Sequence, residues 1–97
     1  MDFEWDEHKN RSNFEKHGIT FEEATAIFDG PTFTTVDDRS EYNEVREISI
    51  GTLGMAVIAV VVHTDRNGNI RLISARKANK RERTIYHGYI ERTIEEH

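Results

Sequence analysis

Hydrophobic and polar residues follow a helical spacing in the first third of the chain. Residues 6–17 are mostly polar, with Asp6 placed to cap a helix and Gly18 placed to end it in a left-handed conformation. Thr20 and Glu23 then form a capping-box pair ahead of apolar positions 21, 24, 27 and 28, and the sequence Asp-Gly-Pro follows. Two short N-terminal helices are therefore predicted.

The spacing changes to that of strands after Pro31. Residues 32–36 and 45–50 are rich in β-branched residues, and residues 55–62 are an almost unbroken apolar run of the kind found in a buried central strand. We expect residues 51–54 to form a turn, and Asn67-Gly68 a hairpin before a strand over residues 70–76. The sheet is predicted to have about four antiparallel strands, with Phe3–Trp5 as a possible short edge strand.

A last helix is expected after Asn79, because Glu82 stands three residues later as its capping partner. The apolar side of this helix is formed by Tyr86, Tyr89, Ile90 and Ile94. The order of elements is two helices, a sheet and a closing helix. We therefore predict one α+β domain over residues 1–97.

Composition agrees with a single small domain, since 36% of the 97 residues are apolar. The chain has no cysteine, no apolar run near 20 residues and no basic, then apolar, amino terminus, so we expect a cytoplasmic protein without a membrane contact.

Charge is unevenly spread over a chain whose net charge is −5. Residues 1–50 hold 5 Lys and Arg against 13 Asp and Glu, and residues 51–97 hold 8 against 5. Five cations and one anion fall within residues 76–83, which predicts a patch that attracts phosphate. Two other interpretations are a solvated basic helix start and, for the acidic half, a surface for a basic partner.

Polar residues of the first helix recur on one side. Lys9, Asn13, Lys16 and His17 stand at i, i+4, i+7 and i+8, which places two amines, an amide and an imidazole together. This side is a candidate site. The alternative is a solvated helix face, with His17 placed where the helix dipole favours its charged form.

Further candidate residues follow the last strand, where Arg76 lies at the strand exit and Arg83, Tyr86 and His87 lie about one helical turn later. We expect this end of the molecule to share a cleft with the polar side of the first helix. Tyr86 has core packing as its alternative role, and His63 is more simply a structural histidine. Other site classes lack support: the histidines show no metal-ligand spacing, and neither a phosphate loop nor a nucleophile elbow is present.

Two blocks of residues resemble the BrnT family of bacterial toxins, over Phe3 to Tyr86. The first is Phe3-x-Trp5-Asp6-x-x-Lys9-x-x-x-Asn13-x-x-Lys16-His17-Gly18, and the second is Arg71-x-Ile73-Ser74-Ala75-Arg76-x-Ala78 followed by Glu82-Arg83-x-x-Tyr86. Between them lie Phe21-x-Glu23-Ala24, Phe28, Arg46, Gly51 and Val62-His63-Thr64. The resemblance implies a RelE-like fold and a ribonuclease that inhibits translation and growth. It also implies a ribbon-helix-helix antitoxin of the BrnA type, in a two-to-two complex that binds operator DNA.

Metal-free RNA cleavage needs a base for the ribose 2′-hydroxyl, cations at the phosphate and an acid for the leaving oxygen. The candidate catalytic residues are His17, Arg76, Tyr86 and Lys9, and the candidate RNA-binding residues are Lys16, Arg71, Lys77, Lys80, Arg81 and Arg83. No metal or cofactor is expected. A non-catalytic module that binds a protein partner and nucleic acid, and acts as a co-repressor, is the alternative function.

Overall fold

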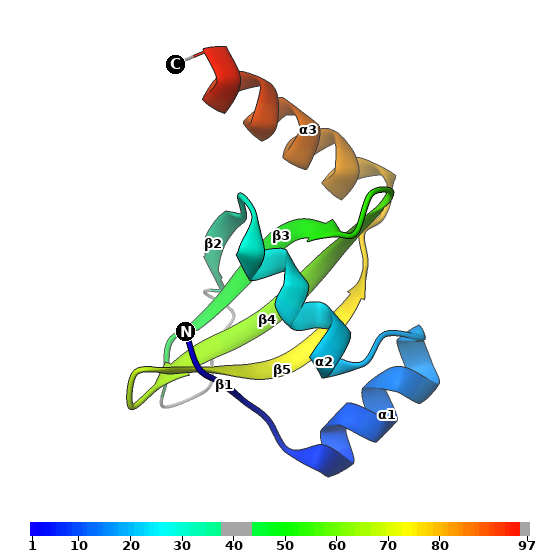
Figure 1. The fold of residues 1–97 in the computed structure, drawn as a ribbon, viewed down its shortest axis with the longest axis vertical. Helices are drawn as coiled ribbons and strands as arrows, with labels where there is room; N and C mark the ends of the chain where they lie inside the picture. Colours follow the sequence, from blue (N-terminus) through cyan, green and yellow to red (C-terminus); the bar gives the residue numbers. More distant parts are fainter. Residues whose placement is uncertain (38–43, 96–97) are drawn as a thin grey trace.

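The computed structural model describes residues 1–37 and 44–95. Most of the segment between the strands predicted at residues 32–36 and 45–50 therefore lies outside the described residues. Three helices, a short 3₁₀ segment and five strands follow one another along the chain (Figure 1). Their order is β1 (Phe3–Glu4), α1 (Glu7–His17), α2 (Phe21–Ala24), η1 (Thr25–Asp29), β2 (Phe33–Asp37), β3 (Arg46–Leu53), β4 (Val57–Arg66), β5 (Asn69–Lys77) and α3 (Lys80–Glu95).

The sheet differs from the expected four-stranded antiparallel one. Its strand order is β1-β5-β4-β3-β2, and β1 pairs parallel with β5 while the other neighbours are antiparallel. The prediction of about four antiparallel strands differs in one respect: the possible edge strand at residues 3–5 joins the sheet as β1, only two residues long, and pairs in parallel with residues 70 and 71. The observed fold is α+β with a five-stranded mixed sheet.

Each face of the sheet has its own hydrophobic core. One face packs against α2 and η1 through buried residues that include Phe21, Ile27, Val61 and Leu72. The other face packs against α3 through Ile50, Val60 and Tyr86, joined by partly buried Phe33, Tyr89 and Ile90. We call this second surface the α3 face. Figure 1 shows that α3 leaves the sheet as it proceeds, which explains why Ile94, on its apolar side, is 68% exposed.

Helix ends form as the local sequence predicts. Asp6 accepts hydrogen bonds from the backbone N–H groups of His8 and Lys9, and Gly18 ends α1 with φ of 73°. Thr20 and Glu23 make the complete capping box of α2. The expected hairpin between β4 and β5 is also confirmed, since Asn67 and Gly68 both have positive φ.

The turn predicted at residues 51–54 lies at residues 54–56 instead, because β3 continues through Gly51 to Leu53 and β4 begins only at Val57. Gly51 is in a strand for a packing reason. A Cβ built there would lie 2.8 Å from the Cβ of Ile27 and 3.2 Å from its carbonyl oxygen. The glycine therefore lets η1 sit directly on the sheet.

The short β1 covers the edge of β5 only at residues 70 and 71. Further along β5, the Asn13 side chain covers this edge. Asn13 of α1 accepts a hydrogen bond from the Ala75 N–H at 3.0 Å and donates one to the Ala75 carbonyl at 2.8 Å. Its amide thus makes both bonds that a neighbouring strand would make.

None of the helices in the described part of the chain is long and apolar enough to cross a membrane.

Candidate functional site

Side chains from five strands line up in rows on the α3 face, because directly paired residues point to the same side of a sheet. Arg46 and Arg71 both pair with Thr64, so two arginines flank this threonine in one row. The acidic residues Asp37 and Glu4 pair with them at the outer ends. Two rows further along, Val60 pairs with Arg76, close to where α3 begins. These two rows of the α3 face therefore carry three arginines.

A less polar row separates these arginines. It consists of Thr35, Ile48, Val62 and Ser74, which are exposed or partly exposed although β3 and β4 are central strands. The opposite face of the same strands is closed, since Ala59, Val61 and Ser49 have no exposed surface. The α3 face thus has a solvent-accessible strip of apolar and hydroxyl side chains, with arginines on both sides of it.

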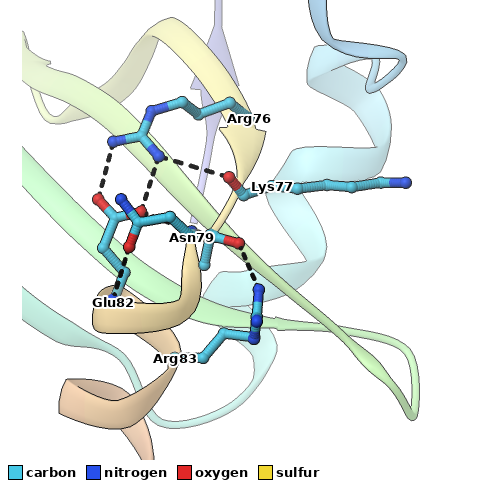
Figure 2. A network of polar contacts seen from close by, with 6 residues as sticks. Arg76, Lys77, Asn79, Glu82 and Arg83 are labelled. Carbon is cyan, nitrogen blue, oxygen red and sulfur yellow. Dashed lines mark hydrogen bonds and ion pairs between the residues drawn. The ribbon is translucent and has the colours of Figure 1, made fainter.

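Arg76 is held by an ion pair at the start of α3 (Figure 2). Its Nη1 and Nη2 donate to the two carboxylate oxygens of Glu82, each at 2.8 Å, and Nη1 also donates to the Lys77 carbonyl at 3.4 Å. The hydrogen bonds between Arg76 and Glu82 lower the pKa of the Glu82 carboxyl and raise that of the guanidinium, so the pair stays charged at neutral pH. The Arg76 side chain nevertheless remains 43% exposed.

The predicted cap of α3 fixes Glu82 in turn. The Asn79 side chain accepts a hydrogen bond from the Glu82 N–H at 2.8 Å, and the Glu82 carboxylate accepts one from the Asn79 N–H at 2.9 Å. Arg83 donates to the Ala78 carbonyl at 2.9 Å. The end of β5 and the start of α3 are therefore tied together by side chains as well as by the chain itself.

Arg71 is also paired. It donates to Glu4 at 2.8 Å, and Asn69 donates to the other oxygen of the same carboxylate at 3.2 Å. The hydrogen bond from Arg71 is the main reason that the pKa of Glu4 lies below its usual value. This contact links β1 to β5, so Arg71 has a clear structural role beside its proposed contact with RNA.

The polar side of α1 does form a cluster. All four predicted residues, Lys9, Asn13, Lys16 and His17, line an open hollow of about 190 Å³ together with Ile73 and Ser74 of β5. Ile73 is the extra residue of a bulge opposite Val62 and His63, and bulges often redirect side chains at functional sites. Ser74 belongs to the exposed row of the α3 face and lies two residues from Arg76, roughly 7 Å along a strand.

The cations at the start of α3 line a different hollow. Lys77 and Arg83 border a depression of about 280 Å³ with residues 56–58 and Ala78, and Lys77 also borders a larger one of about 520 Å³ beside α2. Neither includes a residue of the α1 cluster. Lys77, Lys80 and Arg81 are all exposed. The two predicted groups thus approach each other at Ser74 rather than sharing one hollow.

Tyr86 lies outside the accessible surface. It is 3% exposed, and its hydroxyl donates to the Pro31 carbonyl at 2.7 Å. Burial raises the pKa of this phenol. The observed contacts are those of the core-packing alternative, in which Tyr86 fastens α3 to the segment before β2.

Sequence reasoning missed a chain of polar contacts on the opposite face, which leads from exposed Thr34 to buried Ser49 and His63. The Thr34 hydroxyl contacts that of Ser49 at 2.7 Å, and Ser49 contacts Nε2 of His63 at 2.7 Å. His63 is 6% exposed and meets the ring of Phe28 edge-on. Alternation along β3 and β4 places Ser49 and His63 on one face, but only the register makes them neighbours.

The comparisons with known proteins agree with these features. Residues 5–82 match the family model described as the ribonuclease toxin BrnT of a type II toxin-antitoxin system. A crystal structure of the Brucella abortus ribonuclease toxin BrnT has a similar fold, with a TM-score of 0.62 and 24% sequence identity over 82% of this chain and 99% of that chain. No curated protein matches the chain. Because the matching family model covers well over half of its length, this chain belongs to the BrnT family of ribonuclease toxins of type II toxin-antitoxin systems.

Proposed function

We propose that this chain is an endoribonuclease that cuts RNA without a metal ion and thereby inhibits translation and growth. The 2′-hydroxyl of one nucleotide attacks the adjacent phosphate, the 5′-oxygen leaves, and a 2′,3′-cyclic phosphate remains. The observation that carries the proposal is Arg76, which is charged, accessible and held at the rim of the open α3 face in a BrnT-family chain. A fixed guanidinium is suited to stabilise the negative charge that builds on the phosphate.

The other roles are assigned by position. His17, with Lys9 and Lys16 beside it, is proposed to exchange protons with the ribose and the leaving oxygen, since imidazole does this near neutrality. The hollow that these residues line reaches Ser74 on the strand of Arg76. Arg71, Lys77, Lys80, Arg81 and Arg83 are proposed to bind the RNA backbone, and Tyr86 to hold α3 in place rather than to transfer a proton.

The test is an incubation of the purified protein with a structured RNA in excess EDTA. We expect discrete products that end in 2′,3′-cyclic phosphate, and a rate at least about 100-fold lower for Arg76→Ala. Arg92→Ala removes an exposed arginine from the last turn of α3 and serves as the matched control. If free RNA stays intact, translating ribosomes are the next substrate. Intact RNA there as well would refute the nuclease and favour the non-catalytic co-repressor.

We further propose that a BrnA-type ribbon-helix-helix antitoxin neutralises the toxin in the cytoplasm. It would cover the region of Lys9, His17 and Arg76, and its DNA-binding part would bring the complex to operator DNA. Since such antitoxins are two-fold dimers, a two-to-two complex is expected. A native mass of the co-expressed complex tests the stoichiometry, and a structure with the three residues uncovered would refute the masking. The RelE-like relationship of the fold is part of the same proposal.

A further inference from the structure

The guanidinium of Arg76 makes hydrogen bonds through Nη1 and Nη2 to Glu82, and through Nη1 to Lys77. A guanidinium has five N–H donors in a plane, of which four belong to Nη1 and Nη2. Glu82 accepts one from each of these atoms, in the end-on arrangement with two parallel bonds of 2.8 Å. The Lys77 carbonyl accepts the other hydrogen of Nη1, at 3.4 Å.

Two donors remain, on Nε and on Nη2, and they form the second bidentate edge of the same plane. No described residue accepts a hydrogen bond from Nε, and the side chain is 43% exposed. In Figure 2 the Nε side of the guanidinium points away from both the Glu82 carboxylate and the Lys77 carbonyl. Two parallel N–H groups on one edge match two oxygens of a phosphate.

We propose that Glu82 is a positioning residue, which orients Arg76 so that its Nε–Nη2 edge binds two oxygens of the phosphate that is cut. This inference rests on the proposed ribonuclease function and assigns Glu82 to its site. A free arginine side chain samples many rotamers, and most of them would turn this edge away from the α3 face. With the other edge occupied, the guanidinium keeps one orientation before RNA arrives.

Glu82 is suited to this role because it is fixed itself. Its Oε1 accepts from the backbone N–H of Asn79 as well as from Arg76, so the carboxylate itself is anchored to the main chain. It is also the less exposed partner, at 19%. The carboxylate reduces the long-range attraction of Arg76 for RNA, and the exposed Lys77, Lys80 and Arg81 remain to supply it.

A double-mutant cycle on the single-turnover cleavage rate tests the proposal. We expect Glu82→Ala to lower the rate about tenfold and Arg76→Ala at least about 100-fold. If Glu82 acts through Arg76, the double variant cleaves no more slowly than Arg76→Ala alone. Binding of a fully 2′-O-methylated RNA should change by less than about threefold in Glu82→Ala, because the effect lies in orientation.

Two controls separate positioning from helix capping and from charge. Asn79→Ala removes the side-chain bond to the Glu82 N–H but keeps the backbone N–H that holds the Glu82 carboxylate. Glu91→Ala removes an exposed carboxylate of α3. Both should cleave within about twofold of the unmodified protein. Nitrogen NMR of the Arg76 side chain supplies a readout without catalysis. Separate, slowly rotating Nη signals are expected in the unmodified protein and not in Glu82→Ala.

Each outcome has one meaning. Rate losses that multiply in the double variant, a loss in Asn79→Ala equal to that in Glu82→Ala, or a freely rotating Arg76 in the unmodified protein would each overturn the positioning role alone. An unmodified protein that cleaves neither free RNA nor RNA on ribosomes would overturn the proposed function, and the role of Glu82 in it.

Discussion

At the scale of single residues, the side chains of two asparagines of α1 satisfy backbone N–H and C=O groups of neighbouring segments. Besides its bonds to Ala75, Asn13 donates to the Ile19 carbonyl at 2.9 Å, and it is 6% exposed. Asn10 accepts from the Phe21 N–H at 2.7 Å and so fixes the start of α2. An amide is suited to both places because it carries donors and an acceptor. The mostly polar α1 is therefore held by hydrogen bonds where other helices are held by apolar contacts.

Replacing Asn13 by Ala should be strongly destabilising. The change leaves the N–H and carbonyl of Ala75 without partners at a buried position, and each such group costs about 1–3 kcal/mol. We expect the free energy of unfolding in urea to fall by about 2–4 kcal/mol in total. Ser12→Ala, at the neighbouring exposed position, should change it by less than about 0.5 kcal/mol. Equal stability of the two variants would show that the β5 edge does not depend on Asn13.

At the scale of secondary structure, the sequence predicted what local interactions decide. Caps at Asp6, Thr20 and Asn79 involve residues within three positions of each other, and the hairpin at Asn67-Gly68 needs only its own backbone angles. The parallel pairing of β1 depends on residues 67 positions away, and two residues carry no periodicity. The short edge strand was therefore expected, but its parallel pairing, which depends on tertiary contact, was not.

In the candidate site, too, the features set by local spacing were predicted, and the contacts set by tertiary structure were not. Helical spacing predicted the cluster of Lys9, Asn13, Lys16 and His17, and all four residues line the hollow. Spacing did not show that the Asn13 amide is also bound to the backbone of β5. A buried role for Asn13 had a signal, since asparagine is unfavourable within a helix. Glu82 was recognised as a cap from its distance to Asn79, whereas its bond to Arg76 depends on how β5 meets α3.

Glycines in two elements should respond oppositely to alanine. In β3, Gly51→Ala places a Cβ 2.8 Å from that of Ile27, so η1 must move, at a cost of about 1–3 kcal/mol. In α3, a Cβ on Gly88 would meet only the Arg92 guanidinium, at 3.5 Å. Gly88→Ala should therefore stabilise the helix by about 0.5–1 kcal/mol. Thermal unfolding of the two variants checks the signs, and a stabilising Gly51→Ala would contradict the packing of η1 on β3.

At the scale of the whole molecule, proton binding opposes folding at several places. Burial lowers the pKa of His63, and hydrogen bonds lower those of Glu4, Asp6, Glu23 and Glu82. In every case the folded state binds protons less readily than the unfolded chain does. Stability should therefore rise with pH through each of these ranges, and acid should destabilise the fold.

Among these groups, His63 determines the pH dependence of stability at the highest pH, because histidine has the highest ordinary pKa. The unfolded chain takes up a proton as pH falls below about 6.5, whereas folded His63, buried against Phe28, does so only at lower pH despite the opposing effect of Glu47. Stability should thus be complete above that pH and decline from there towards pH 5, with a slope of at most about 1.4 kcal/mol per unit. His63→Gln removes the titrating ring and leaves an amide to contact Ser49. Urea unfolding between about pH 5.5 and 8, above the range in which the carboxyl groups take up protons, should be nearly independent of pH in this variant. An unchanged slope would show that another group is responsible.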